Sequence, residues 1–275
     1  MARGQDETCR AFHGGDAMNQ EERARVFAAL HRKGDPIVLY NIWDAGSARC
    51  VAEAGARALA TGSWSVAAAH GFGDGQKIPL QLLVEIAREI VAATDLPLSV
   101  DFEGAYSEDP AQGAANVAQL IDAGAIGINF EDQVVGKGGV HPIGKQAARI
   151  RAIREMGERQ SVPLFINART DLFLQESDAA RHPGLMHDAI ARAKAYAEAG
   201  ASGFFAPGLA DAELIGKLCA QSALPVNVMM KPGAPDLATL AAAGVGRVSY
   251  GPFPYRAMTA WLKGEAEKVY GSAGT

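Results

Sequence analysis

Two apolar segments of this sequence end in acidic residues, and these acids are the first candidates for chemistry. The segment Pro97–Gly104 carries Asp101 and Glu103, and the segment Ala125–Asp132 carries Glu131 near its end. Residues two apart in a β-strand share a face, so Asp101 and Glu103 are expected to point the same way. Buried carboxylates usually have a metal ion or basic side chains as partners. The pattern therefore predicts a carboxylate cluster that holds a cation.

Polar residues also end the other apolar segments. Asp74 lies in a glycine-rich stretch, Arg169 follows the segment that begins at Pro163, and Lys137 lies with His141 in the glycine-rich loop 134–144. Further candidates at these ends are Trp43, Asp44, Gly62, Ser63, Trp64, Asp132, Asp171 and Asn227. Several carboxylates without a His or Cys ligand group favour a hard cation such as Mg2+, held largely through water, with Mn2+ as the alternative ion.

Mg2+ beside a cationic Arg suits a substrate that chelates metal through adjacent oxygens, such as a 2-oxo acid. The metal would act as a Lewis acid on developing enolate charge. Backbone N–H groups around Gly62, Ser63 and Trp64 are expected to form a cradle for an oxyanion or a carboxylate. The sequence thus indicates a site for a small anionic substrate.

A repeating unit of two strands and two helices must position these residues. Apolar strands entered by proline begin at Pro36, Pro97, Pro163 and Pro225, and an Ala-Gly pair midway through each unit ends a helix and opens another strand. Four units make eight βα pairs, which predicts an α/β (β/α)8 TIM barrel, a fold of about 250 residues. The expected strands are 36–43, 56–62, 97–103, 125–131, 163–170, 202–207, 225–230 and 247–251. A doubly wound open sheet is the alternative, but the sequence has neither a dinucleotide fingerprint nor a P-loop.

The chain is expected to have one domain. Residues 1–17 are predicted to form a loose N-terminal tail, and residues 18–275 a single barrel domain with an extra N-terminal helix. Asn19 and Glu22 have the spacing of a capping box and place the start of that helix, which should run to about Lys33.

Composition limits the kinds of partner. The 275 residues are 48% hydrophobic and carry a formal net charge of -5, which gives no basic field for nucleic acid or an anionic membrane. The N-terminus has no apolar signal segment, and no later segment has the length of a membrane helix. Three cysteines without paired spacing suit a reducing compartment. We expect a cytoplasmic protein with a small-molecule partner.

Several candidates also have a purely structural interpretation. Asp101 and Glu103 could form a salt-bridge cluster with Arg169, although buried ion pairs are weak stabilisers. Asp44 is as well placed to cap a helix as to serve a site. The loop 134–144 is either a surface loop or a lid that closes over the substrate.

In its motifs, the chain resembles the isocitrate lyase/phosphoenolpyruvate mutase superfamily from about Pro36 to Met258. The matching stretches are 41–49, the turn 61–64, Asp74, 101–106, 131–133 with Lys137, and 168–171. The resemblance implies Mg2+ held by Asp101, with Glu103, Glu131 and Asp74 acting mainly through water. It also implies a 2-oxo-acid carboxylate on the amides near Ser63 and Trp64, an enolate oxygen stabilised by Arg169, and a homo-oligomer, a dimer or a homotetramer, in which subunits exchange the last helix.

The loop after the fourth strand departs from the family's lyases. Family lyases that act on isocitrate or 2-methylisocitrate carry a catalytic Cys in a Lys-Lys-Cys-Gly-His-type lid, whereas this chain has Lys137-Gly138-Gly139-Val140-His141. This difference disfavours both activities. Asp101-Phe102-Glu103 also replaces the family's Asp-x-Asp, and Gly62 stands at the family's usual Ser position.

We therefore expect a Mg2+-dependent lyase-type enzyme that breaks a C–C bond of a small 2-oxo dicarboxylic acid through an enolate, as in decarboxylation of an oxaloacetate-like substrate. Arg169, Lys137 and Glu131 are its expected catalytic residues. The expected substrate-binding residues are Trp43, Gly62, Ser63, Trp64, Asp101, Arg169 and Asn227. The alternatives are a phosphonopyruvate-type P–C bond hydrolase or mutase, and a barrel that binds 2-oxo acids without turning them over.

Overall fold

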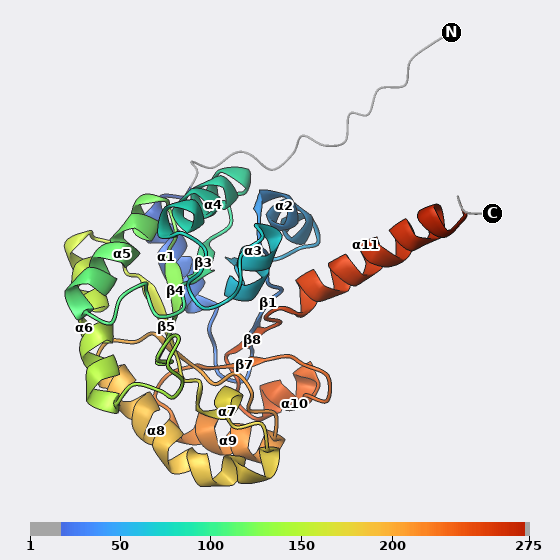
Figure 1. The fold of residues 1–275 in the computed structure, drawn as a ribbon. Coiled ribbons are helices and arrows are strands. Elements are labelled where there is room, and N and C mark those ends of the chain that lie inside the picture. Colours follow the sequence, from blue (N-terminus) through green and yellow to red (C-terminus); the bar gives the residue numbers. More distant parts are fainter. Residues whose placement is uncertain (1–17, 273–275) are drawn as a thin grey trace.

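Eight parallel strands form a barrel surrounded by helices (Figure 1). The structure is a computed structural model, and it describes residues 18–272. The strands are β1 (Ile37–Leu39), β2 (Leu59–Ala60), β3 (Leu98–Asp101), β4 (Gly127–Glu131), β5 (Phe165–Arg169), β6 (Gly203–Phe205), β7 (Val226–Met229) and β8 (Arg247–Ser249). Each expected strand is present, so the predicted (β/α)8 barrel is confirmed, although the strands are shorter than expected.

Helices follow the strands around the outside of the barrel. They are α1 (Gln20–Ala29), α2 (Ala45–Glu53), α3 (Ser63–Ala69), α4 (Leu80–Ala93), α5 (Pro110–Asp122), α6 (Ile143–Arg159), α7 (Leu172–Gln175), α8 (His182–Glu198), α9 (Ala212–Gln221), α10 (Leu237–Ala242) and α11 (Phe253–Ser272), with a 3-10 turn η1 (Ala179–Arg181). No helix between residues 18 and 272 is both long and apolar enough to cross a membrane.

The predicted helix boundaries follow from local chemistry. The capping box of Asn19 and Glu22 is present at the start of α1, which ends at Ala29 rather than near Lys33. Asp44 caps α2: its side chain accepts a hydrogen bond from the backbone N–H of Ser47 at 2.7 Å, so its structural interpretation is the one observed. The predicted tail 1–17 lies outside the described residues, and the prediction of a single domain remains a prediction.

The seam between β1 and β2 closes the barrel. The sheet order runs β1-β8-β7-β6-β5-β4-β3-β2, and Ile42 pairs with Thr61 in an isolated parallel bridge across the remaining gap. The buried Asn41 side chain reinforces this seam, because its Nδ2 donates to the carbonyl of Thr61 at 2.8 Å. Its Oδ1 accepts from the backbone N–H groups of Tyr250 and Gly251, both at 2.8 Å. One side chain thus ties together the first, second and last strands.

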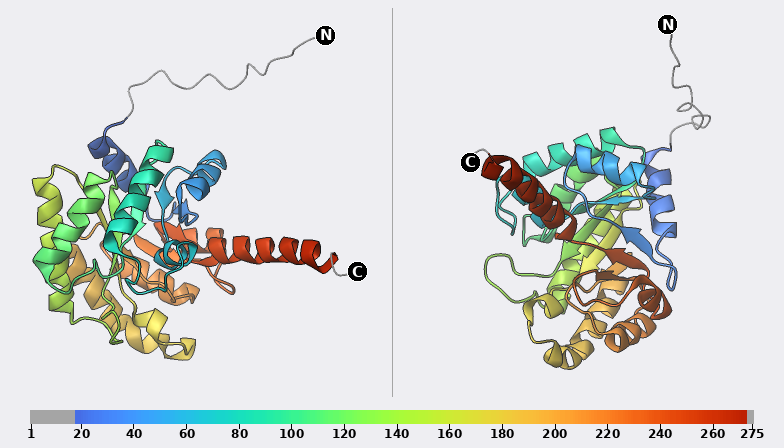
Figure 2. Two further views of the ribbon diagram at one scale, coloured as in Figure 1. Left: turned by 45° about the horizontal axis from the view of Figure 1, so that its top comes forward. Right: turned by 90° about the vertical axis from the view of Figure 1, so that its right-hand side faces the viewer.

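The C-terminal helix α11 leaves the barrel and projects outward (Figures 1 and 2). Its first residues pack against the barrel, since Pro254 is buried and the Tyr255 ring meets Trp43 edge-on at 5.0 Å between ring centroids. Farther along, Trp261 and Tyr270 are 65% and 79% exposed. This shape agrees with the idea that α11 packs on another subunit, and the exchange of this helix remains a prediction.

Candidate functional site

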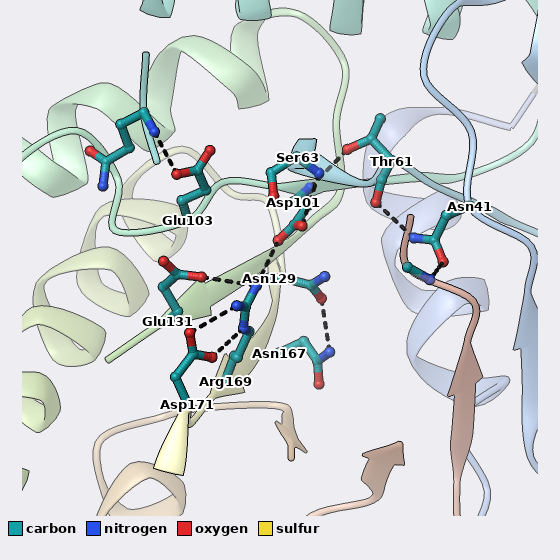
Figure 3. Close-up of polar contacts among 12 residues, drawn as sticks. Asn41, Thr61, Ser63, Asp101, Glu103, Asn129, Glu131, Asn167, Arg169 and Asp171 are labelled. Atoms are coloured by element: carbon teal, nitrogen blue, oxygen red, sulfur yellow. Dashed lines mark hydrogen bonds and ion pairs between the residues drawn. The ribbon is translucent and has the colours of Figure 1, made fainter. Parts of the chain in front are cut away.

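Asp101 ends β3 at the carboxyl end of the barrel and is held in place by backbone contacts (Figure 3). Its own N–H donates to Thr61 Oγ1 at 2.9 Å, and the backbone N–H of Ser63 donates to its Oδ2 at 3.0 Å. Its Oδ1 is buried and accepts no hydrogen bond from the described residues, with Arg169 Nη1 4.0 Å away. Asp101 therefore presents one oriented oxygen that lacks a hydrogen-bond donor. The Ser63 amide, expected to hold substrate, is occupied by Asp101.

Glu103 does not lie on the strand, which corrects the expectation that β3 extends to residue 103. The strand ends at Asp101, and Glu103 has a left-handed φ of 48° in the turn that follows. Its Oε2 accepts from the backbone N–H of Gln76 at 2.6 Å. Burial, together with the nearby Asp74 and Asp101 carboxylates, raises the pKa of Glu103 to about 8. The side chain still joins the acidic cluster, but through the turn rather than through strand alternation.

Arg169 at the end of β5 lies among three carboxylates (Figure 3). Its Nη1 is 2.9 Å from Glu131 Oε2 and 4.0 Å from Asp101 Oδ1, and its Nε lies 2.5 Å from Asp171 Oδ1. Burial raises the pKa of Glu131, and the nearby carboxylates of Asp171 and Asp101 oppose the lowering effect of Arg169. For Arg169, burial acts to lower the pKa, but the surrounding carboxylates outweigh it and raise the pKa. The guanidinium is thus fixed in one orientation by its acidic neighbours.

Two cavities, of about 200 Å³ and about 210 Å³, meet at this cluster. Ser63, Asp74 and Arg169 line both of them. Burial raises the pKa of Asp74, and the Asp101 carboxylate adds to the effect. The first cavity is lined by Asn41, Gly62, Ser63, Trp64, Asp74, Asp101, Asn129, Arg169, Leu174, Phe205, Pro207, Met229, Ser249, Gly251, Pro252 and Arg256. The second also contains Glu103, Glu131 and Gln133.

The cluster has a large excess of negative charge. The carboxylates of Asp74, Asp101, Glu103, Glu131 and Asp171 surround the guanidinium of Arg169. Such an excess is stable only with bound protons or a bound cation. Within residues 18–272 no group of three or more His, Cys, Asp or Glu side chains is arranged to hold a metal directly. An all-oxygen set with one free oxygen, on Asp101, nevertheless fits a hydrated Mg2+, which keeps several waters.

Some predicted site residues lie away from the cavities. Lys137 is 74% exposed and pairs with Glu108 at 3.4 Å, in a hairpin closed by pairing of Gln133 with Val140. His141 is buried, and its backbone N–H donates to the carbonyl of Asp132 at 2.7 Å. The structure therefore does not bring Lys137 together with the acidic cluster.

Two predicted substrate-binding residues, Trp43 and Asn227, do not line either cavity. Trp43 packs against Tyr255, and Asn227 Oδ1 accepts from the hydroxyl of Ser249, which does line the cavity, at 3.1 Å. Both residues support the lining in this conformation.

Sequence reasoning missed most of the apolar and amide lining. Asn41 and Ser249 lie near strand ends, where an Asn or Ser is as typical of a turn as of a site, so their residue types alone do not assign them to the cavity. Leu174, Phe205 and Met229 carry no chemical signal in the sequence. Arg256 lies beyond the last strand, where strand-end reasoning does not reach.

An eight-stranded parallel barrel with an acidic site at its carboxyl end, suited to binding a cation, is typical of metal-dependent barrel enzymes. Comparison with known proteins identifies the family. Residues 27–270 match the family described as phosphoenolpyruvate phosphomutase. The chain belongs to this family and thereby to the phosphoenolpyruvate mutase/isocitrate lyase superfamily of Mg-dependent enzymes that cleave or form C–C and P–C bonds.

Relatives differ in their assigned activities. The uncharacterised protein MT2054 of Mycobacterium tuberculosis is 35% identical over 84% of this chain and 83% of its own length. The 2-methylisocitrate lyase of Escherichia coli K12 is 28% identical over 92% of this chain and 85% of its own length. A crystal structure of a Burkholderia cenocepacia J2315 protein assigned as a phosphonomutase is 48% identical, with a TM-score of 0.88 over 91% of this chain and 99% of that one. The family is thus established, whereas its branches carry different reactions.

Proposed function

We propose that the protein is a Mg2+-dependent lyase-type enzyme that breaks a C–C bond of a small 2-oxo dicarboxylic acid, as in decarboxylation of an oxaloacetate-like substrate. This proposal rests on the charge imbalance at the barrel's carboxyl end, where five carboxylates surround Arg169 beside a cavity of about 200 Å³. That volume holds roughly seven water molecules, which suits a small acid. A phosphonopyruvate hydrolase of this fold, 20% identical, has been crystallised with oxalate and Mg2+, and oxalate resembles the enolate of a 2-oxo acid.

The residues of this chain would divide the work as follows. Asp101, with its free Oδ1, would hold the metal, and Glu103, Glu131 and Asp74 would hold it through water. When bound, Mg2+ supplies Lewis-acid polarisation of the 2-oxo group. Arg169, fixed by Glu131 and Asp171, would present an Nη1 donor to the oxygen that gains negative charge. Because these groups are already oriented, little reorganisation is needed as the charge develops.

Lys137 enters the proposal as a third catalytic residue. In this structure its ammonium contacts Glu108, so a catalytic role requires the 134–144 loop to move over the cavity. Replacing Lys137 with Met should then lower activity by about 10²-fold or more, the usual range for a general acid or base. An unchanged rate would remove Lys137 from the mechanism.

The loop composition is the basis for disfavouring 2-methylisocitrate cleavage. The hairpin Lys137-Gly138-Gly139-Val140-His141 offers no thiol to act as the acid, and Cys50 and Cys219, the described cysteines, lie outside it. Relatives named 2-methylisocitrate lyase match at 28–30% identity in Escherichia coli and Bacillus subtilis. Product formation from 2-methylisocitrate would overturn this part of the proposal.

The central experiment measures Mg2+-dependent binding of oxalate by calorimetry and thermal shift. Binding to the folded state alone raises the melting temperature, so the wild type should be stabilised by oxalate only when Mg2+ is present. Asp101→Asn should lose this effect. Asp44→Asn is the matched control: it makes the same acid-to-amide change at a strand end, outside the cavity, and Asn is an equally good helix cap. Full Mg2+ and oxalate affinity in Asp101→Asn would contradict the proposal.

A second candidate, P–C bond cleavage or rearrangement, is favoured by the 48% identical structure assigned as a phosphonomutase. Product analysis separates the two reactions. Decarboxylation of oxaloacetate yields pyruvate and CO2, whereas hydrolysis of phosphonopyruvate yields pyruvate and inorganic phosphate. Tight Mg2+-dependent binding of both acids with no product from either would indicate a binding protein without catalysis.

A further inference from the structure

Arg247 on β8 is a buried arginine without a counter-charge. It is 1% exposed, and it forms no ion pair with the rest of residues 18–272. Burial lowers its pKa to about 9, and the Asp101 carboxylate opposes the shift, so the guanidinium is charged at neutral pH. By contrast, Arg169 and Arg192 each pair with carboxylates. An unpaired buried cation lowers stability, so folding alone does not explain Arg247.

The hydrogen bonds of Arg247 lead to two residues of the cavity lining. Its Nη2 donates to Asn129 Oδ1 at 3.2 Å, and its Nε donates to Ser249 Oγ at 3.3 Å. Asn129 and Ser249 both line the first cavity, whereas Arg247 does not. Its Nη1 is buried and has no hydrogen-bond partner among the described residues. Arg247 therefore lies behind the lining, and it reaches the cavity through these two side chains.

These contacts determine the orientation of the Asn129 amide. A guanidinium only donates hydrogen bonds, so the atom of Asn129 that faces Arg247 must be the oxygen. The same Oδ1 accepts from Asn167 Nδ2 at 2.8 Å (Figure 3). With the oxygen held by two donors, the NH2 group is left over, and no described residue accepts a hydrogen bond from it. Asn129 therefore presents a donor to the cavity that it lines.

This donor lies beside the proposed metal site. Asn129 and Asp101 are register partners on the neighbouring strands β4 and β3, which run about 4.8 Å apart, and both side chains line the first cavity. The Oδ1 of Asp101 is the buried oxygen that accepts no hydrogen bond from the described residues. A ligand on a cation held by Asp101 is thus within reach of the Asn129 amide. The amide, with the charge of Arg247 behind it, favours a negatively charged oxygen there.

We propose that Asn129 binds a negatively charged oxygen of the substrate, and that Arg247 is the positioning residue that orients this amide and supplies positive charge behind it. This inference rests on the proposed function, because it places a metal-bound acid at Asp101. It adds a binding residue and the buried group that prepares it. A cationic side chain in place of Asn129 would lie closer to Asp101 and oppose Mg2+ binding, whereas an amide provides a donor without net charge.

Arg247→Met separates this role from a purely structural one. Met removes the charge and fills a similar volume, and the two side chains that Arg247 contacts keep Asn167 and Asn227 as partners, so the fold should persist. Removal of a positive charge near Asp101 should raise Mg2+ affinity about 3- to 10-fold. Oxalate affinity at saturating Mg2+ should instead fall about 10-fold or more. Calorimetry measures both affinities, and a loosened barrel would lower the two together.

Asn129→Asp tests the donor itself. The carboxylate would give Arg247 the counter-charge that it lacks, so urea denaturation should show little loss of stability. It would offer no N–H group to the cavity. Oxalate affinity should fall about 100-fold or more, because a donor is lost and a like charge is added, while Mg2+ should still bind.

Arg247→Lys keeps the charge but not the fork that reaches both lining residues. Its Mg2+ affinity should stay within about twofold of the wild type, and its oxalate affinity should lie between those of the wild type and Arg247→Met. Arg154→Met is the matched control, because Arg154 also donates to a carbonyl and a hydroxyl, those of Gly200 and Ser202, but does not line the cavity. Neither affinity should change in this control.

Three results would overturn the inference. An oxalate affinity within about twofold of the wild type in Asn129→Asp would mean that the amide does not contact the ligand. An unchanged oxalate affinity in Arg247→Met, or a parallel loss of Mg2+ and oxalate affinity, would remove the positioning role. A wild-type protein that binds no oxalate with Mg2+ would overturn the proposed function and this inference together, whereas the variant results overturn the inference alone.

Discussion

Glu131 and Asp132 are adjacent in the chain, yet they belong to two different kinds of buried ion pair. Asp132 faces the helices, where its Oδ2 accepts from Arg192 at 3.0 Å and from the Tyr196 hydroxyl at 2.9 Å. Its Oδ1 accepts from the backbone N–H of Asp171 at 3.0 Å. Glu131 faces the cavity and shares Arg169 with other acids. One pair is satisfied by protein donors, and the other lies in a cluster with too few cations.

The difference teaches that burial of an acid–arginine pair does not by itself indicate function. Burial raises the pKa of both Glu131 and Asp132, so the direction of the shift does not separate them either. The balance of charge separates the two acids, because Asp132 pairs mainly with Arg192, whereas five carboxylates compete for Arg169. An imbalance next to a cavity marks a place where something else must bind.

The largest effect should come from breaking the satisfied pair. Replacing Arg192 with Met leaves the carboxylate of Asp132 buried without a counter-charge, so the free energy of unfolding should fall by about 3–5 kcal/mol. Urea denaturation measures this change. A fall below about 1 kcal/mol, typical of an exposed pair, would show that this pair is not the structural one. Arg181→Met is the matched control, because Arg181 is 72% exposed in its pair with Glu176.

Breaking the unbalanced pair should affect activity more than stability. Glu131→Gln keeps the size of the side chain and removes one negative charge, so the metal-free protein should lose little stability. Mg2+-dependent activity should fall about 10- to 100-fold, as when a group that orients a metal's ligands is lost. Steady-state kinetics and urea denaturation of the same sample test both halves. A large loss of stability with normal activity would reverse the assignment.

The unbalanced cluster should also make Mg2+ binding depend on pH. The pKa of Glu103 is raised from its ordinary 4.5 to about 8, so the metal-free folded protein keeps a proton there that the unfolded chain has lost. The metal-free protein should therefore lose stability as the pH rises from 4.5 toward 8. Because Mg2+ displaces the proton, its affinity should rise up to about tenfold per pH unit and level off above pH 8.

Calorimetric titrations with Mg2+ across this range test the pH prediction. Glu103→Gln should remove the slope. Glu108→Gln, a change at an exposed acid outside the cluster whose pKa is lowered to about 2 by Lys145 and Lys137, should leave it intact. A slope that survives in Glu103→Gln would assign the proton to another acid of the cluster.

The smallest effect is expected at Asp44, an acid at a strand end that belongs to neither pair. Asp44→Ala removes the cap of α2 and should cost about 1 kcal/mol of unfolding free energy, whereas Asp44→Asn should be close to neutral. Oxalate affinity should not change in either variant. A loss of oxalate binding would place Asp44 in the site after all.

Sequence reasoning placed the strands well, because proline at strand entry and glycine after helices are backbone signals that need no tertiary context. Gly55, Gly124, Gly200 and Gly244, which follow helices, all have positive φ between 88° and 97°. The carboxyl ends of parallel strands meet at one end of a barrel, so Asp101, Glu131 and Arg169 could be grouped in advance.

What could not be foreseen depended on local turns and on distance beyond the strands. Glu103 itself adopts the left-handed conformation, and because it is not a glycine, its residue type does not predict a turn there. The positive charge of Lys137 does not predict that the hairpin places its side chain beside Glu108 rather than beside the acidic cluster. Arg256 lines the cavity from the start of α11, where the Tyr255 ring packs on Trp43 and Trp64, and no local sequence motif predicts such packing.

The Asn41 side chain, which ties β1 and β2 to the loop after β8, links completion of the first cavity to synthesis of that loop. During synthesis Asn41 leaves the ribosome early, while its partners at Tyr250 and Gly251 emerge among the last residues of the barrel. Asn41 and Gly251 both line the cavity, and Arg256 follows them. The lining of the first cavity is therefore complete only after the loop that follows β8 has been translated.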